Sequence, residues 1–145
     1  MVKKEILVKK TIDVTANDVW ETVRSFDRVE RYVPIVKSST IQGSGKGCQR
    51  TCSVQFGEQE VKVVERLEYL DDDKMTLQFS ISEAPPPFQG LQFQIQIISL
   101  DEAKSEVQIS TELLNGNSEV IKTIQDIFQM IADGLKKLHE NKVGV

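Results

Sequence analysis

The sequence is poor in cysteine and histidine and has no long apolar run. Its 145 residues include two cysteines and one histidine, and because structural zinc sites take four such ligands, a zinc centre is excluded. No apolar stretch approaches the roughly 20 residues that cross a bilayer. The first apolar run stops at Lys9 and Lys10, too early for a signal peptide. We expect a cytoplasmic protein with no stable membrane insertion and no metal or other cofactor.

The two cysteines cannot form a disulfide with each other. Cys48 and Cys52 are four residues apart in one predicted strand, which separates their Cα atoms by about 13 Å at roughly 3.3 Å per residue. Bridged Cα atoms lie within about 7 Å of each other. Both side chains are therefore predicted to be reduced thiols that pack in the interior.

Charge and composition describe one folded domain. Hydrophobic residues make up 39% of the sequence and charged residues 28%, which is ordinary for a globular protein, and 145 residues suit a single domain spanning 1–145. The net charge of -4 and the absence of a basic stripe argue against nucleic-acid binding. Composition does not decide between a monomer and a homodimer, so a homodimer stays open.

The hydrophobic periods predict an α+β fold. The alternation over 4–14 indicates a strand, and Val19, Trp20 and Val23 recur at helical spacing in the helix that follows. A second short helix is predicted over 27–32. Six further strands are predicted at 35–42, 46–56, 60–70, 74–83, 90–100 and 105–114, and a long amphipathic helix at 118–141. This order predicts a seven-stranded curved antiparallel sheet around the long C-terminal helix.

A strongly bent sheet and a single helix touch along a line and diverge on either side of it. The usual result is a cavity, and a cavity with apolar walls and a few polar groups is where a small ligand is expected. The only histidine, His139, lies near the end of the long helix and is expected to be solvated. The glycines over 43–47 join two strands instead of a strand and a helix, which excludes a phosphate-binding loop.

Three charged side chains, Lys37, Arg50 and Glu65, share a strand face with apolar residues. The in-phase neighbours are Ile35, Ser39 and Ile41 for Lys37, Cys48, Cys52, Val54 and Phe56 for Arg50, and Val61, Val63, Leu67 and Tyr69 for Glu65. Because an isolated buried charge is costly, the three should pair with one another, reach water or contact a charged ligand. A general acid/base pair is a third interpretation, although no nucleophile accompanies it.

Several segments, each weak alone, occur together in a specific order. They are Val19-Trp20, 23–27, 32–38, 47–50, 65–67, 70–72, 79–81, 116–118 and 134–138. In this order the chain resembles the START-like, or SRPBCC, superfamily, within it the polyketide cyclase/dehydrase-type proteins and the plant abscisic acid receptors. The resemblance implies the helix-grip fold. It also implies that Lys37 holds a ligand carboxylate and that Glu65 joins a network of water molecules.

The sequence also departs from the receptors. A short turn at Gly57-Glu58-Gln59 stands where the receptors have their gate, and the proline-rich segment 83–89 stands where they have their latch. The resemblance therefore implies a pocket without a hormone-triggered lid and without phosphatase inhibition. A loop at 85–88 that contacts a partner or membrane is a further alternative.

The predicted function is binding of a small hydrophobic or amphipathic, and in one interpretation acidic, ligand in the cavity. The alternative is a polyketide cyclase or dehydratase that uses the same cavity, and binding is favoured over catalysis. No catalytic residue is assigned. The predicted ligand-binding residues are Lys37, Arg50, Glu65, Phe79, Ile81, Phe88, Leu91, Phe93, Ile127 and Ile131.

Overall fold

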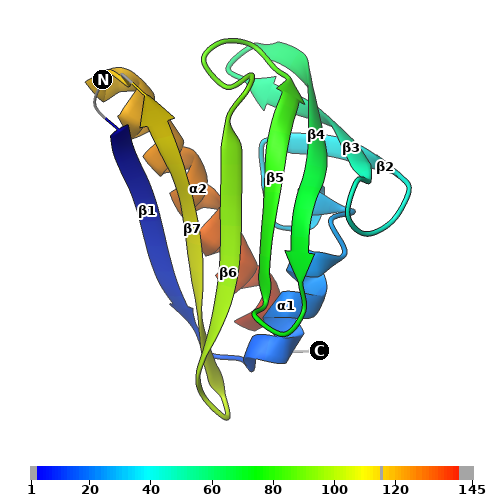
Figure 1. Cartoon of the computed structure of the whole chain (residues 1–145), viewed down its shortest axis with the longest axis vertical. Coiled ribbons are helices and arrows are strands. Elements are labelled where there is room, and N and C mark those ends of the chain that lie inside the picture. Colours follow the sequence, from blue (N-terminus) through cyan, green and yellow to red (C-terminus); the bar gives the residue numbers. More distant parts are fainter. Residues whose placement is uncertain (1–2, 115, 141–145) are drawn as a thin grey trace.

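One curved antiparallel sheet and a long helix on its concave side make up the computed structural model, which describes residues 3–114 and 116–140 (Figure 1). The elements are β1 (Lys3–Ile12), α1 (Ala16–Arg24), the 3-10 turn η1 (Val29–Arg31), β2 (Val36–Gln42), β3 (Gln49–Phe56), β4 (Gln59–Asp71), β5 (Thr76–Glu83), β6 (Gln92–Asp101), β7 (Lys104–Leu114) and α2 (Ser118–Glu140). The spatial order is β1-β7-β6-β5-β4-β3-β2. The predicted α+β helix-grip architecture is confirmed; the predicted helix end at Asn141 lies outside the described residues.

The first helix begins and ends where its capping residues require. The Thr15 hydroxyl accepts a hydrogen bond from the backbone N–H of Asp18, which satisfies one of the free donors of the first turn. After the helix, Phe26 and Arg28 take left-handed backbone conformations with φ of 62° and 48°. Helical hydrogen bonding cannot continue through such residues. The predicted second helix over 27–32 is therefore corrected to the single 3-10 turn η1.

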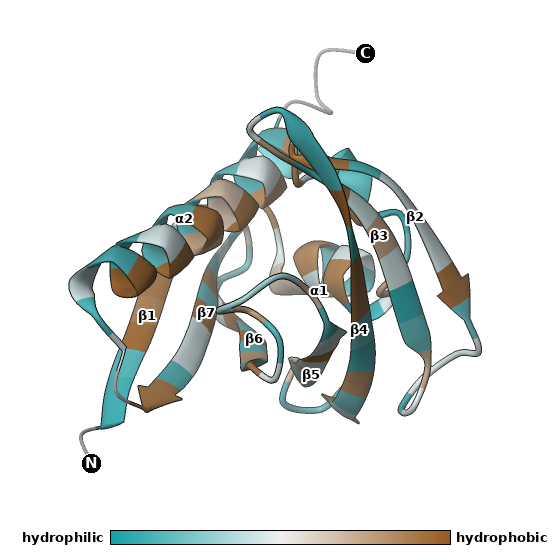
Figure 2. Ribbon diagram, turned by 90° about the horizontal axis from the view of Figure 1, so that it is seen from above, coloured by the Kyte–Doolittle hydropathy of each residue, from teal (hydrophilic) through white to brown (hydrophobic). Residues whose placement is uncertain are grey.

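One part of the interior lies where α2 crosses β1 and β7 (Figure 2). Side chains from these elements are fully removed from water, among them Ile12, Val107, Ile109 and Ile124. On the helix the same buried face extends to His139, which is 3% exposed. The expectation that His139 is solvated is wrong, because its position continues the helix face that packs on the sheet.

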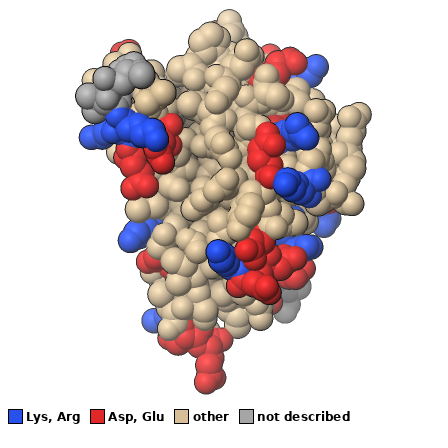
Figure 3. All heavy atoms as spheres, viewed as in Figure 1, with Lys and Arg blue, Asp and Glu red and all other residues tan. Residues whose placement is uncertain are grey.

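The outer face of the sheet is polar but uncharged at its centre. Figure 3 shows acidic and basic side chains on the two sides of this face and few between them. Gln78 on β5 donates a hydrogen bond to Gln94 on β6 over 2.8 Å and accepts one from Gln92 over 3.1 Å. Phe93 and Ile95 point the other way and are buried. The predicted dry and wet faces of this strand are confirmed.

Two bulges reverse the strand phase that the sequence pattern predicts. The register shifts between Val36 and Ser38 in the pairing of β2 with β3, and between Leu67 and Tyr69 in the pairing of β4 with β5. Each bulge adds one residue on its strand and so changes which side chains face inward. Lys37 is exposed, and Tyr69 is 37% exposed. The predictions that these two side chains point inward are wrong.

Candidate functional site

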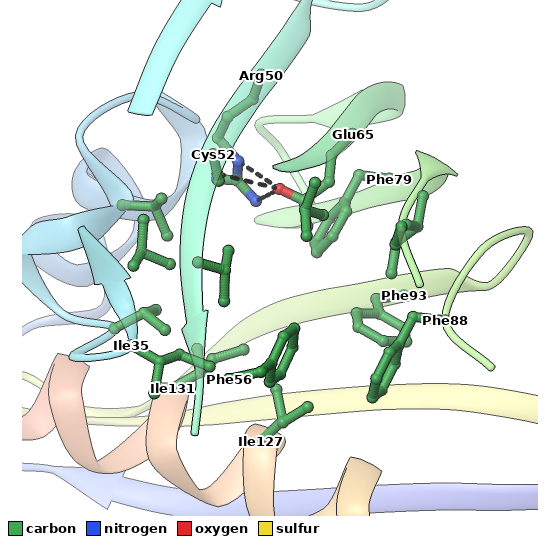
Figure 4. Close-up of a pocket in the computed structure, with 17 residues that line it drawn as sticks. Ile35, Arg50, Cys52, Phe56, Glu65, Phe79, Phe88, Phe93, Ile127 and Ile131 are labelled. Carbon is green, nitrogen blue, oxygen red and sulfur yellow. Dashed lines mark hydrogen bonds and ion pairs between the residues drawn. The ribbon is translucent and has the colours of Figure 1, made fainter. Parts of the chain in front are cut away.

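A cavity of about 90 Å³ lies between α2 and the inner faces of β2 to β6 (Figure 4). Its walls are almost entirely apolar, and among the described residues that line it Arg50 and Glu65 are the charged ones. The lining residues are Val29, Val33, Ile35, Val36, Arg50, Cys52, Val54, Phe56, Val63, Glu65, Phe79, Ile81, Ala84, Phe88, Phe93, Ile127 and Ile131. An apolar chamber with a few convergent polar groups has the composition of a small-molecule site.

Most of the residues predicted for the site lie around this one cavity. Its walls include Arg50, Glu65, Phe79, Ile81, Phe88, Phe93, Ile127 and Ile131. Two predicted residues do not belong to the lining. Lys37 is the extra residue of the β2 bulge and points to solvent, and Leu91, directly before β6, is half-buried against the edge of the core.

The prediction missed two kinds of lining residue. Cys52, Val54 and Val63 lie in phase with Arg50 or Glu65 on β3 and β4, so the strand pattern already placed them on the inner face. A second group, which includes Val33 and Ala84, lies in turns and loops. No hydrophobic period marks such residues, so their place depends on the tertiary fold.

Arg50 and Glu65 form a buried ion pair at one end of the cavity. They are direct register partners on β3 and β4, and Nε and Nη2 of Arg50 each lie 2.7 Å from Oε1 of Glu65. The two side chains are only 6% and 12% exposed. Burial alone would lower the pKa of Arg50, but the charge of Glu65 and its neighbours outweighs burial and raises it. The guanidinium of Arg50 therefore stays charged, and its charge is balanced by its ion-pair partner.

The backbone turn after α1 also holds the guanidinium. Arg50 donates a hydrogen bond from Nη1 to the carbonyl oxygen of Phe26 over 3.1 Å. Its carbon Cζ lies 3.8 Å from the centre of the Phe26 ring and 5.2 Å from that of Phe79, within the range of a cation–π contact. Arg50 thus joins β3, β4 and the left-handed turn at Phe26, and its position is fixed before any ligand binds.

The thiol beside this ion pair is not activated. Sγ of Cys52 lies 3.9 Å from Oε1 of Glu65, and burial together with that carboxylate raises the pKa of the thiol to about 12. The thiolate is the nucleophilic form of cysteine. At neutral pH Cys52 is therefore a protonated packing residue, and both cysteines are free and buried as predicted.

Aromatic rings enclose the remainder of the cavity. Phe79, Phe93 and Phe128 form a chain of edge-to-face contacts with centroid separations of 5.6 and 4.9 Å. Phe56, at the end of β3, stacks on Phe88 of the β5–β6 loop at 5.8 Å and an interplanar angle of 4°. Phe88 is half-buried. The cavity walls thus include Phe79 and Phe93 on the sheet and Phe88 in the loop, while Phe128 of α2 supports the ring of Phe93.

Other kinds of site find no support in the described part of the chain. Residues 3–114 and 116–140 contain no group of three or more His, Cys, Asp or Glu side chains placed to hold a metal ion. Within the same ranges no helix has an apolar stretch long enough to span a membrane.

A curved sheet that wraps one helix around an apolar cavity has a known counterpart. Residues 4–140 match the family described as polyketide cyclase / dehydrase and lipid transport. The chain belongs to this family. Members of such a family bind hydrophobic small molecules, which agrees with the composition of the cavity walls.

Similar proteins include plant receptors and bacterial proteins. The chain is 36% identical over 73 residues to the abscisic acid receptor PYL7 of Arabidopsis thaliana, over 50% of this chain and 35% of that one. With PYL2 it shares 28% identity over 96% of this chain and 75% of the receptor. Thus the chain spans about a third of the first receptor and three quarters of the second.

Solved bacterial structures share the fold over nearly the whole chain. An uncharacterised protein from Bacillus thuringiensis superposes with a TM-score of 0.76 at 25% identity, over 95% of this chain and 98% of that one. XoxI from Bacillus cereus superposes with a TM-score of 0.77 at 21% identity, over 94% of each chain. At this level of identity the likeness to XoxI is one of fold.

Proposed function

We propose that the protein binds one small, largely apolar molecule in the cavity between α2 and the sheet. The observation that carries the proposal is the lining itself. Apolar side chains from η1, β2 to β6, α2 and two loops surround a single neutral ion pair. Burial of apolar ligand surface supplies about 25 cal/mol per Å². The ion pair at one end supplies orientation.

The cavity limits the size of what it can hold without rearrangement. Its volume of about 90 Å³ is well below the roughly 300–1,000 Å³ typical of pockets for drug-sized ligands. A single ring or a short branched chain suits this volume. Any larger ligand requires Phe88 to leave its stack on Phe56, and the β5–β6 loop that carries Phe88 is the adjustable wall.

The acidic ligand of the sequence-based interpretation has weaker support. The plant relatives are named receptors for abscisic acid, and the resemblance assigned the ligand carboxylate to Lys37. Lys37 is exposed to solvent at the bulge. The buried cation, Arg50, already forms an ion pair with Glu65. An acid would therefore enter a chamber that has no unneutralised cation among the described lining residues.

A cyclase or dehydratase would require a proton donor and a proton acceptor that face the same ligand. The described lining offers one carboxylate, which is paired, and the Cys52 thiol with its raised pKa. Binding without catalysis is therefore the function that this geometry supports best.

Native mass spectrometry of the purified protein tests the proposal. We expect a small apolar molecule at a ratio near one to one, identified after denaturing extraction. Val63→Phe, which fills the cavity from β4, should abolish its retention. The adjacent Val64→Phe changes the half-exposed opposite face of the same strand and should retain it. Equal retention by both variants would contradict the cavity as the binding site.

A further inference from the structure

The polar end of the cavity has a specific imbalance of hydrogen-bonding groups. Both short contacts from Arg50, and the weaker one from Cys52, end on the same oxygen of Glu65, Oε1. Figure 4 shows these contacts converging on one atom. Within the described residues no donor contacts the second oxygen, Oε2. An ionised carboxylate accepts hydrogen bonds at both oxygens, so one acceptor is left over.

This unused acceptor belongs to a residue that lines the cavity. Glu65 lines the chamber and keeps 12% of its side chain exposed, twice the exposed fraction of Arg50. The guanidinium donates to Glu65 from Nε and Nη2 and to the Phe26 carbonyl from Nη1. It also interacts with the buried hydroxyl of Tyr32 and packs on the Phe26 ring. A molecule that fills the cavity thus meets an acceptor that lacks a donor.

Resting on the proposed function, we infer that the ligand is neutral and carries a hydrogen-bond donor, an alcohol or phenol on an apolar skeleton, which donates to Oε2 of Glu65. Desolvation of an acceptor is costly unless a donor replaces the lost water, so a hydroxyl binds better than the bare hydrocarbon. The apolar remainder of the ligand contacts residues such as Ile81, Phe93 and Ile127.

A carboxylic acid does not satisfy the same arrangement. Its carboxylate would bring a second negative charge beside Glu65 into a chamber whose charges already cancel. Like charges in a poorly solvated site repel strongly, and an ionised group loses its hydration there. The same argument applies to a cationic amine beside Arg50.

Three probes of one skeleton separate these cases: toluene, benzyl alcohol and benzoate, titrated at pH 7 and followed by methyl NMR of the cavity residues. We expect benzyl alcohol to bind about tenfold more tightly than toluene, the effect of one buried hydrogen bond. Benzoate should bind at least tenfold more weakly than the alcohol. Toluene or benzoate binding as tightly as the alcohol would overturn this inference alone. Absence of binding by all three probes would overturn the proposed function as well.

Glu65→Gln provides a second, opposite expectation. The variant keeps the size of the side chain but removes its charge, which leaves Arg50 as an unneutralised cation. The preference should therefore invert, with benzoate binding more tightly than benzyl alcohol. An unchanged ranking in the folded variant would overturn the inference. Should the variant fail to fold, the ranking of the three probes on the wild-type protein decides alone.

Discussion

The two halves of the interior differ in how tightly α2 closes on the sheet. In the packed half, where α2 lies over β1 and β7, Ile12, Val107 and Ile109 have no exposed surface. In the hollow half, over β3 to β5, residues of the same type surround a cavity of about 90 Å³; Val54, Val63 and Ile81 are examples. One straight helix cannot follow a strongly curved sheet along its whole width, so close packing on one side leaves space on the other.

The two halves of the interior also differ in the kinds of side chain that they contain. The packed half supplies mainly hydrophobic stabilisation, although it also buries Ser105 and His139. The hollow half contains the Arg50–Glu65 pair and the aromatic cluster. A buried ion pair contributes little to stability relative to apolar residues of the same volume. We therefore propose that the pair beside the cavity orients a ligand in addition to joining β3 and β4.

The largest effect is expected at Gly134, where α2 lies directly against the backbone of Tyr32. A Cβ on Gly134 would lie 1.6 Å from the carbonyl oxygen of Tyr32, a backbone atom that cannot turn aside. Gly134→Ala should lower the free energy of unfolding by about 3 kcal/mol or more, measured by urea denaturation. The exposed Gln125→Ala on the same helix should change it by less than about 0.5 kcal/mol. A neutral or stabilising Gly134→Ala would contradict this packing.

Removing one partner of the ion pair in the hollow half should destabilise the fold strongly. Replacing both partners by apolar residues should cost little stability. Arg50→Met leaves Glu65 as an uncompensated buried charge and should cost about 3 kcal/mol of unfolding free energy. The double variant Arg50→Met/Glu65→Leu should recover most of that loss, because no charge remains. A double-mutant cycle by chemical denaturation measures both values. Additive losses would show that the two side chains act independently.

Two isoleucines on one face of α2 allow a direct comparison of the two halves. Ile124 has no exposed surface, whereas Ile131, seven residues later, is 9% exposed and lines the cavity. Ile124→Ala should cost about 2–3 kcal/mol, since it creates a new void. Ile131→Ala enlarges space that already exists and should cost about half as much, while it increases the affinity for ligands larger than one ring. Equal costs without a change in affinity would remove the distinction between the halves.

Lowering the pH should decrease the free energy of unfolding through two carboxylates of the packed half, by less than the substitutions above. Lys10 and Gln129 lower the pKa of Asp133, and Lys136 and the Asp13 amide lower that of Glu140. Because the folded-state pKa values are lowered, this stabilisation is complete above the unfolded value of about 4 and is lost as the pH falls through the folded values. Unfolding free energies at pH 7 and pH 3 should show the loss, reduced in 1 M NaCl. Greater stability at pH 3 would contradict it.

The fold was predictable because the hydrophobic period is strong in most elements. Phe93, Ile95 and Ile97 alternate with glutamines, and Ile124, Phe128, Ile131 and Leu135 repeat at helical spacing. The pattern failed at Lys37 and Tyr69, where a bulge on the strand changes the phase. Bulges depend on backbone hydrogen bonds between strands, which a single-strand pattern does not contain.

Part of the site could also be predicted from the sequence. The two-residue turn at Gly57-Glu58 fixes the register of β3 and β4 by counting outward from Phe56 and Gln59, which pairs Arg50 with Glu65. The pairing of Arg50 with Glu65, instead of either with Lys37, was therefore predictable from the sequence alone. The volume of the cavity could not, because it is a small difference between the positions of packed elements.

The measurement that most directly tests the binding function is a toluene titration of methyl-labelled protein followed by NMR. We expect saturable shifts of the methyl groups that line the cavity, those of Val54, Val63, Ile81 and Ile127, and no comparable shifts in the packed half. No saturable shift with toluene or with benzyl alcohol, or shifts of equal size in both halves, would contradict a binding site in the hollow half.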